Sequence, residues 1–226
     1  MIINKFPYSK ITRNSVNGKR LYLTPDGCKV ASVTTILDQT KSEESKKALQ
    51  NWRNSIGANK AQEITMEAAG RGTRMHSYLE AYVSTNELPI PGSNPYAKQS
   101  NEMAKVILDK GLNNLTECYG SEVSLYYPEL FAGTTDLVGL YKGELAILDF
   151  KQTNKPKDNS RVEDYKIQLA AYIEAHDKLY ETKINLGVIL MCSKDMHFQT
   201  WEIRGNELER YKHLWWNKVA QYYDTE

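Results

Sequence analysis

Two aspartates and a lysine near the middle of the chain have residue types and a spacing that could do chemistry. Asp136 and Asp149 flank the pair Lys142-Gly143, and the glycine permits a two-residue hairpin turn there. Such a turn places Asp136 directly opposite Asp149 on one face of a sheet, with Cβ atoms about 4.5–5.5 Å apart. A three-residue loop or a bulge would shift this pairing by one residue. Lys151 follows two residues after Asp149, so its side chain is expected on the same face.

This trio suits the hydrolysis of a phosphodiester bond. Two opposed carboxylates repel each other unless a cation offsets their charge, and hard oxygen ligands suit Mg²⁺ or Mn²⁺. A bound metal ion neutralises phosphate charge and lowers the pKa of a water ligand. The lysine can orient or deprotonate that water, or stabilise the developing negative charge. The alternative is a solvated strand end whose charges have no catalytic role.

Two further pairs of polar residues have helical spacing. His76 and Glu80 lie four residues apart, as do Gln168 and Tyr172, so each pair would share one face of a helix. Taken alone, each pair is compatible with ordinary amphipathic packing. Glu122 begins an alternating stretch, and the pattern alone is compatible with a surface residue.

Hydrophobic periodicity predicts the elements that must position these residues. Residues 1–31 are expected to form loops and short strands, with a turn at Pro25-Asp26-Gly27. Helices are expected at about 32–39, 43–65, 66–83, 97–111, 162–180 and 207–223, and strands at about 122–127, 132–141, 144–151, 184–191 and 197–204. This order predicts a single α/β (α+β) domain over residues 1–226, in which helices flank a central mixed sheet.

The charge of the chain is unevenly distributed. The 226 residues have a net charge of only +1, but residues 1–75 carry 13 basic and 6 acidic side chains, and residues 76–226 carry 16 and 22. We expect a basic, largely helical portion in 1–75 that binds nucleic acid, and a catalytic core in 76–226. Residues 40–75, with Arg71 and Arg74, are expected to face the metal site across the path of a strand. Lys155 could extend a phosphate track beside the site, although such residues are usually only solvated.

Other classes of protein are disfavoured. No apolar run approaches the roughly 18 residues of a membrane helix, and the first residues lack the layout of a signal peptide. The three cysteines are scattered and odd in number. This pattern favours a reducing, cytoplasmic compartment and argues against an iron–sulfur cluster.

Four short motifs, in this order, resemble those of a known nuclease family. They are Ser32-Val-Thr-Thr-Ile-Leu with the later Leu49-Gln-Asn-Trp52, Arg71-Gly-Thr-Arg74-Met-His76-x-x-x-Glu80, Gly133-x-x-Asp136 leading to Asp149-Phe150-Lys151, and Gln168-Leu-Ala-Ala-Tyr172. Together they resemble the RecB-type branch of the PD-(D/E)xK nuclease superfamily, and in particular the mitochondrial genome maintenance exonucleases and related phage exonucleases. The resemblance covers about residues 30–175. It implies a restriction-endonuclease-like core with an N-terminal helical extension.

The resemblance also implies a metal site. His76, Asp136 and Asp149 would hold Mg²⁺ or Mn²⁺, with the Phe150 carbonyl as a further ligand. Lys151 would position or activate the attacking water.

Other residues would support this site or contact the nucleic acid. Glu80 and Glu122 would lie beside the ligands, with direct contact of either one with the metal left open. Gln168 and Tyr172 would brace the site or touch the nucleic-acid strand.

The function expected from the residues and the resemblance together is a metal-dependent DNA exonuclease. It would act on single strands or free ends in DNA replication, recombination or repair, and a phage origin fits the compact domain. One alternative is a structure-specific endonuclease on the same core. Another is a catalytically silent DNA-binding protein that assists recombination. No membrane partner is expected, and protein partners are unknown.

Overall fold

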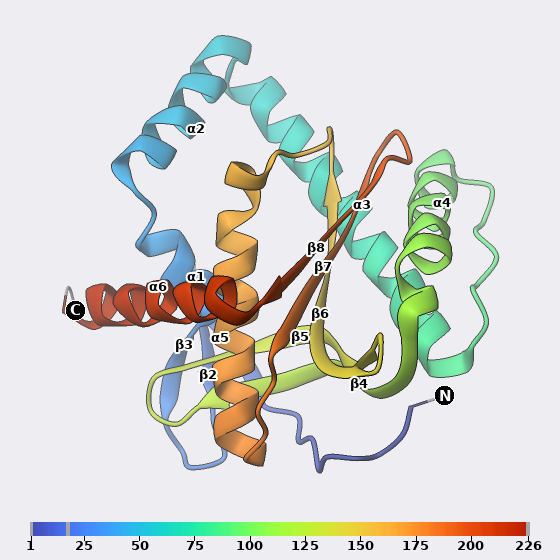
Figure 1. Cartoon of the computed structure of the whole chain (residues 1–226). Helices are drawn as coiled ribbons and strands as arrows, with labels where there is room; N and C mark the ends of the chain where they lie inside the picture. The colour runs from blue at the N-terminus through green and yellow to red at the C-terminus, as the bar shows by residue number, and fades with distance from the viewer. Residues whose placement is uncertain (1, 17–18, 225–226) are drawn as a thin grey trace.

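The computed structural model describes residues 2–16 and 19–224, which form one mixed sheet with helices on both faces (Figure 1). The strands are β1 (Thr12–Val16), β2 (Lys19–Leu23), β3 (Lys29–Ser32), β4 (Leu115–Tyr127), β5 (Phe131–Tyr141), β6 (Glu144–Thr153), β7 (Leu186–Ser193) and β8 (Phe198–Arg204). The helices are α1 (Val33–Gln39), α2 (Glu43–Ile56), α3 (Ala58–Thr85), α4 (Pro95–Lys110), α5 (Glu163–Tyr180) and α6 (Gly205–Tyr223), with short 3₁₀ turns at Leu112–Asn114 and Asn159–Val162. The predicted α/β class with a central mixed sheet is confirmed. Within the described residues, none of the helices is long and apolar enough to cross a membrane.

Strand β5 is where the sheet divides. The strand order is β1-β2-β3-β5-β6-β7-β8, and β4 also pairs with β5. Because β4 follows one edge of β5 along nearly its whole length, β3 and β6 share the other edge. There β3 pairs only with Phe131 and Ala132, and β6 pairs only from Leu137 onward. Among the described strands, residues 133–135 therefore pair with β4 alone.

The β5–β6 hairpin has the two-residue turn expected from the sequence. Lys142 and Gly143 have φ values of 51° and 81°, and a type I′ turn requires this left-handed conformation at both central residues. The ladder ends where Leu137 pairs with Leu148. Asp136 and Asp149 are the next residues beyond this last pair. The predicted register is therefore confirmed as far as Leu137 and Leu148.

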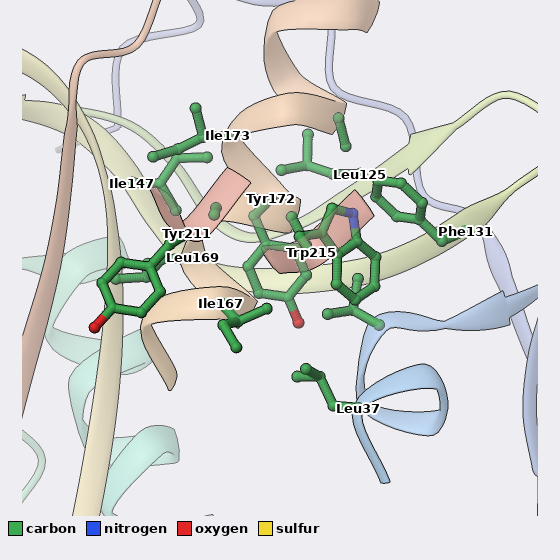
Figure 2. Packing of buried hydrophobic residues seen from close by; sticks show 14 of the residues in the cluster. Leu37, Leu125, Phe131, Ile147, Ile167, Leu169, Tyr172, Ile173, Tyr211 and Trp215 are labelled. Carbon is green, nitrogen blue, oxygen red and sulfur yellow. The ribbon is translucent and has the colours of Figure 1, made fainter. Parts of the chain in front are cut away.

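Helices α1, α5 and α6 cover one face of the sheet and enclose the larger core. Figure 2 shows Leu169 and Ile173 of α5 packed with Trp215 of α6 and Phe131 of β5, and all four side chains are fully buried. The Phe131 and Trp215 rings meet edge to face, with centroids 4.8 Å apart, the geometry that aromatic quadrupoles favour. This packing fixes α5 over the start of β5.

Helices α3 and α4 cover the opposite face. Met75 and Leu79 of α3 are fully buried four residues apart, and they share a core with Met103 and Ile107 of α4. The spacing is that of an apolar stripe on one side of a helix. It presses α3 against the sheet and determines which of its residues reach the strand ends.

Two details of the predicted elements are wrong. The helices expected at 43–65 and 66–83 divide instead at Gly57, whose φ of 84° and ψ of 148° end α2, so α3 is one helix of 28 residues. Strand β4 begins at Leu115 rather than near residue 122, because two register shifts interrupt its alternation. The short strands expected within residues 1–31 are present as β1–β3, and they join the main sheet. Residue 75, where the charge changes sign, lies inside α3.

The N-terminal residues fasten the C-terminal half of α5. Tyr8 and Thr182 contact the two ring nitrogens of buried His176 at 2.9 and 2.8 Å. Thr182 donates its own proton to Asp177, so Nδ1 of His176 carries the ring proton and Nε2 accepts from the Tyr8 hydroxyl. Burial lowers the pKa of His176 to about 4, which keeps the ring neutral in this network.

Candidate active site

Helix α3 carries His76 to the end of β6 because a buried arginine ties the two elements together. Arg71 is only 1% exposed. Its guanidinium donates to Gln152 Oε1 at 3.0 Å and to Asn154 at the end of β6, and it also bonds Glu67 on its own helix. His76, five residues further along α3, therefore lies over the place where β6 separates from β5.

Asp136 is held from two sides. His76 Nδ1 lies 3.2 Å from Asp136 Oδ1, and the Phe150 backbone N–H donates to Asp136 Oδ2 at 2.6 Å. Burial works against ionisation of this carboxyl, but His76 and the Lys151 ammonium outweigh burial and lower the pKa of Asp136. Burial would likewise lower the pKa of His76, but the neighbouring Asp136 raises it. The pair is thus stabilised in its charged form.

Asp149 and Lys151 form the second ionic pair of the site. Asp149 Oδ2 contacts Lys151 Nζ, and the two side chains are 3% and 18% exposed. Burial raises the pKa of Asp149 to about 6. Burial alone would lower the pKa of Lys151, but the carboxylates of Asp149 and Asp136 raise it above its ordinary value. The lysine is therefore an ammonium ion in this arrangement.

Three side chains are grouped as metal ligands would be. Ligand atoms of His76, Glu122 and Asp136 all lie within 4.8 Å of one another. Glu122 reaches this position because it lies across from Asp136, between two paired positions of the β4–β5 ladder. Its φ is 50°, a left-handed conformation that few residues other than glycine adopt. Desolvation and the Asp136 carboxylate raise the pKa of Glu122 to about 7.

The donor atoms of this cluster suit a divalent cation. The two carboxylates are the hard oxygen ligands that Mg²⁺ and Mn²⁺ prefer, and the imidazole nitrogen offers a third donor atom. Desolvation and, after it, repulsion by Asp136 keep a proton on Glu122 at higher pH, and a bound cation would offset this repulsion. Asp149 stands outside the cluster in its pair with Lys151. Its ligation of a metal, and that of the Phe150 carbonyl, stay predictions.

One cavity of about 590 Å³ collects most of the residues predicted from the sequence. It opens at the division of the sheet, between α1, α3 and α5. The predicted residues in its lining are His76, Glu80, Glu122, Asp136, Asp149, Lys151, Gln168 and Tyr172. Residues more than 90 positions apart in the sequence therefore share one pocket.

Gln168 and Tyr172 form one wall of this cavity. Gln168 Nε2 donates to the Tyr172 hydroxyl at 3.0 Å, and Tyr172 is 2% exposed. A Cβ atom at Gly133 would lie 2.6 Å from Tyr172 Cε1, closer than real Cβ contacts allow. The glycine at the start of the Gly133-x-x-Asp136 motif thus makes room for the tyrosine ring above the sheet.

Three residues predicted to bind nucleic acid lie outside the cavity lining. Arg71 is buried, and its guanidinium is engaged by Gln152, Asn154 and Glu67. Arg74 faces α4, where its Nε donates to Ser100 at 3.3 Å and its guanidinium lies 5.8 Å from the Tyr96 ring centroid. Lys155 is exposed just after β6. Their contact with nucleic acid stays a prediction.

The structure adds cavity residues that sequence reasoning missed. Arg13 on β1 lines the cavity, as do Tyr22, Ser32 and Thr34. Arg13 pairs across the strands with Tyr22, so both side chains share the face turned to the cavity. The only available signal was the alternation of β1 and β2, two short strands whose position in the sheet no local pattern reveals.

At the division of the mixed sheet, a His–Glu–Asp cluster that could hold a divalent cation thus lies beside an Asp–Lys pair. No family model matches the chain. In sequence, it is similar to mitochondrial genome maintenance exonuclease 1 of Xenopus tropicalis, at 30% identity over 179 residues that cover 74% of this chain and 49% of that protein. The Mus musculus protein of the same name is 28% identical over 175 residues, covering 74% and 50%.

The resemblance to these exonucleases is thereby confirmed, and the chain spans about half the length of the curated relatives it matches. Among solved structures, a candidate exonuclease from Eubacterium rectale is 15% identical with a TM-score of 0.46, covering 67% of this chain and 66% of that one.

Proposed function

We propose that this chain is a metal-dependent DNA exonuclease of the RecB-type PD-(D/E)xK class. The observation that carries the proposal is the single cavity that holds His76, Glu122 and Asp136 beside the Asp149–Lys151 pair. The relatives named as exonucleases support it, because the similarity extends over three quarters of the chain. The pathway is DNA replication, recombination or repair. Three free cysteines favour a reducing compartment, such as the cytoplasm of a phage-infected cell.

Glu122, Asp136 and His76, the last as a neutral imidazole that has lost its proton, would hold Mg²⁺ or Mn²⁺, and Asp149 would complete the set from the facing strand. When bound, the ion supplies charge neutralisation at the phosphate and a water of lowered pKa. The Asp136 carboxylate is already ionised and oriented by the Phe150 N–H. Such preorganisation matters because a ligand that must reorient on binding weakens affinity.

Lys151 acts as a cation in this proposal. Its raised pKa disfavours a role as the base that removes a proton from water. As an ammonium ion it can donate hydrogen bonds that orient the attacking water and stabilise the negative charge that develops on the phosphate oxygens. Of the three roles left open by the sequence, the proposal therefore adopts orientation and charge stabilisation.

The strand-binding surface is assigned to cationic groups around the cavity. Arg13 lines the cavity and makes no described ion pair, so a phosphate group of the strand is its proposed partner. Helix α2 has no buried residue, and Figure 1 shows it projecting above the body of the molecule between α1 and α3. Its basic residues Lys47 and Arg53 are proposed to contact the backbone of a single strand or a free end.

Digestion of linear and covalently closed circular DNA tests this proposal. We expect end-labelled linear DNA, single-stranded above all, to be shortened in Mg²⁺ or Mn²⁺, while closed circles of the same sequence remain intact. Cleavage of the circles at a comparable rate would contradict the exonuclease and favour the endonuclease. Metal-independent binding without any cleavage would favour the accessory protein.

A further inference from the structure

The ammonium group of Lys151 is held on a second side by an aromatic ring. Lys151 Nζ lies 5.0 Å from the ring centroid of Tyr165. This distance is within the range in which a cation is attracted to the face of a ring. Tyr165 is half-buried at the first turn of α5 and does not line the cavity. The ring therefore stands behind the lysine rather than in the path of a substrate.

Tyr165 is itself fixed by a neighbouring lysine. Lys157 Nζ donates to the Tyr165 hydroxyl at 2.9 Å. The backbone of Lys157 is anchored in turn, because its N–H and its carbonyl both bond the side-chain amide of Gln199 on β8, each at 2.8 Å. A continuous series of contacts thus runs from the strand β8 to the ring that faces Lys151.

The helix places this ring in line with the other site residues of α5. Tyr165, Gln168 and Tyr172 are spaced by three and four residues, so they share one face of the helix. The first of them faces the lysine, and the other two line the cavity. One helix face therefore contacts both the lysine and the space where a substrate would lie.

A lysine needs such a support for its orientation. Its ammonium group is at the end of a flexible four-carbon chain, and Asp149 restrains it from one direction only. If Asp149 also coordinates a metal ion, its ion pair with Lys151 becomes weaker. A ring fixed by its own hydroxyl bond keeps the ammonium on the cavity side.

We propose that Tyr165 is a positioning residue, which holds the Lys151 ammonium in the orientation used for hydrolysis. This inference rests on the proposed nuclease function. The aromatic face is the required group, and the hydroxyl serves only to fix the ring through Lys157. Tyr165 acts through Lys151 and does not contact the DNA.

Two substitutions separate the ring face from the hydroxyl. Tyr165→Met fills a similar volume and keeps helix propensity but removes the ring. We expect it to lower kcat by about tenfold, within the range of a partly desolvated cation–π contact, and to leave KM unchanged. Tyr165→Phe keeps the ring and is expected to restore most of the wild-type kcat. Tyr180→Met, the same change at a half-buried tyrosine fifteen residues along α5, controls for general loss of helix packing.

A second measurement does not depend on activity. Brief acetylation of the folded proteins at one pH, followed by peptide mass spectrometry, gives the reactivity of Lys151 relative to the exposed Lys155. We expect Tyr165→Met to raise this ratio, because the ring no longer covers the ammonium, and Tyr165→Phe to leave it unchanged. Thermal unfolding of each variant confirms that the labelled protein is folded.

The outcomes distinguish failure of this inference from failure of the proposed function. If the wild type digests DNA and Lys151→Ala does not, wild-type kcat in Tyr165→Met overturns the positioning role. A loss in Tyr165→Phe as large as in Tyr165→Met also overturns it, since the hydroxyl would then be the required group. A raised KM with unchanged kcat would make Tyr165 a DNA contact and contradict the inference. If the wild type digests no DNA, the nuclease proposal fails, and the acetylation ratio alone decides whether Tyr165 holds Lys151.

Discussion

The two aspartates that the hairpin brings together have different electrostatic environments. Burial disfavours ionisation of both, but His76 outweighs burial at Asp136, whose pKa is lowered. At Asp149 burial dominates and raises the pKa to about 6, although Lys151 opposes it. Asp136 is therefore a carboxylate ready to bind a cation, whereas Asp149 depends on Lys151 or on a cation for its charge. In the proposed function, Asp136 would therefore act as a metal ligand, and Asp149 would both orient the lysine and bind the ion.

The grouping of His76, Glu122 and Asp136 predicts which substitutions remove metal binding. We expect Asp136→Ala to abolish Mn²⁺ binding in isothermal titration calorimetry. Glu122→Gln should weaken it by more than the roughly tenfold loss that even an outer-shell partner causes. Glu102→Gln, at an exposed position on α4, removes an equivalent charge outside the cavity and should leave the affinity unchanged. Wild-type affinity in Asp136→Ala would contradict this site.

At the scale of elements, the site exists because β6 and β3 leave the same edge of β5 at different places. The hairpin turn and its register could be predicted from Lys142-Gly143, because a two-residue turn fixes pairing locally. The position of Glu122 could not, since its φ of 50° departs from the regular strand that simple alternation assumes. Arg13 was missed for another reason. It reaches the cavity only through the long-range pairing of β3 with β5.

The contact between β5 and α5 predicts the effect of adding one methyl group. In Gly133→Ala the new Cβ would meet the Tyr172 ring. We therefore expect the free energy of unfolding to fall by about 1–3 kcal/mol, the usual cost of overpacking a core. Gly92→Ala, at an exposed position with open space around it, should change this free energy by less than about 0.5 kcal/mol. Chemical denaturation measures both. Equal stability of the two variants would show that Tyr172 does not pack on Gly133.

At the scale of the whole molecule, the small net charge conceals a separation of charge along the chain. The acidic groups of the cavity come mainly from β4, β5 and β6, and the exposed basic groups of α2 come from the N-terminal third. Of residues 40–75, which were predicted to lie beside the site, Gly72 and Thr73 of α3 line the cavity, whereas no residue of α2 does. Periodicity could predict the helices of this segment but not the turn at Gly57 that directs α2 away from α3. Orientation between helices is decided by tertiary contacts that no local pattern contains.

The central claim is metal-dependent hydrolysis that requires Lys151, and one measurement tests it most directly. Wild type and Lys151→Ala are compared on end-labelled single-stranded DNA in Mg²⁺ and in EDTA, with DNA affinity measured in parallel. We predict that the wild type degrades the DNA only with the metal, and that Lys151→Ala is slower by at least about 100-fold. Its DNA affinity should remain close to that of the wild type. Full activity in Lys151→Ala, or equal activity in EDTA, would contradict the account.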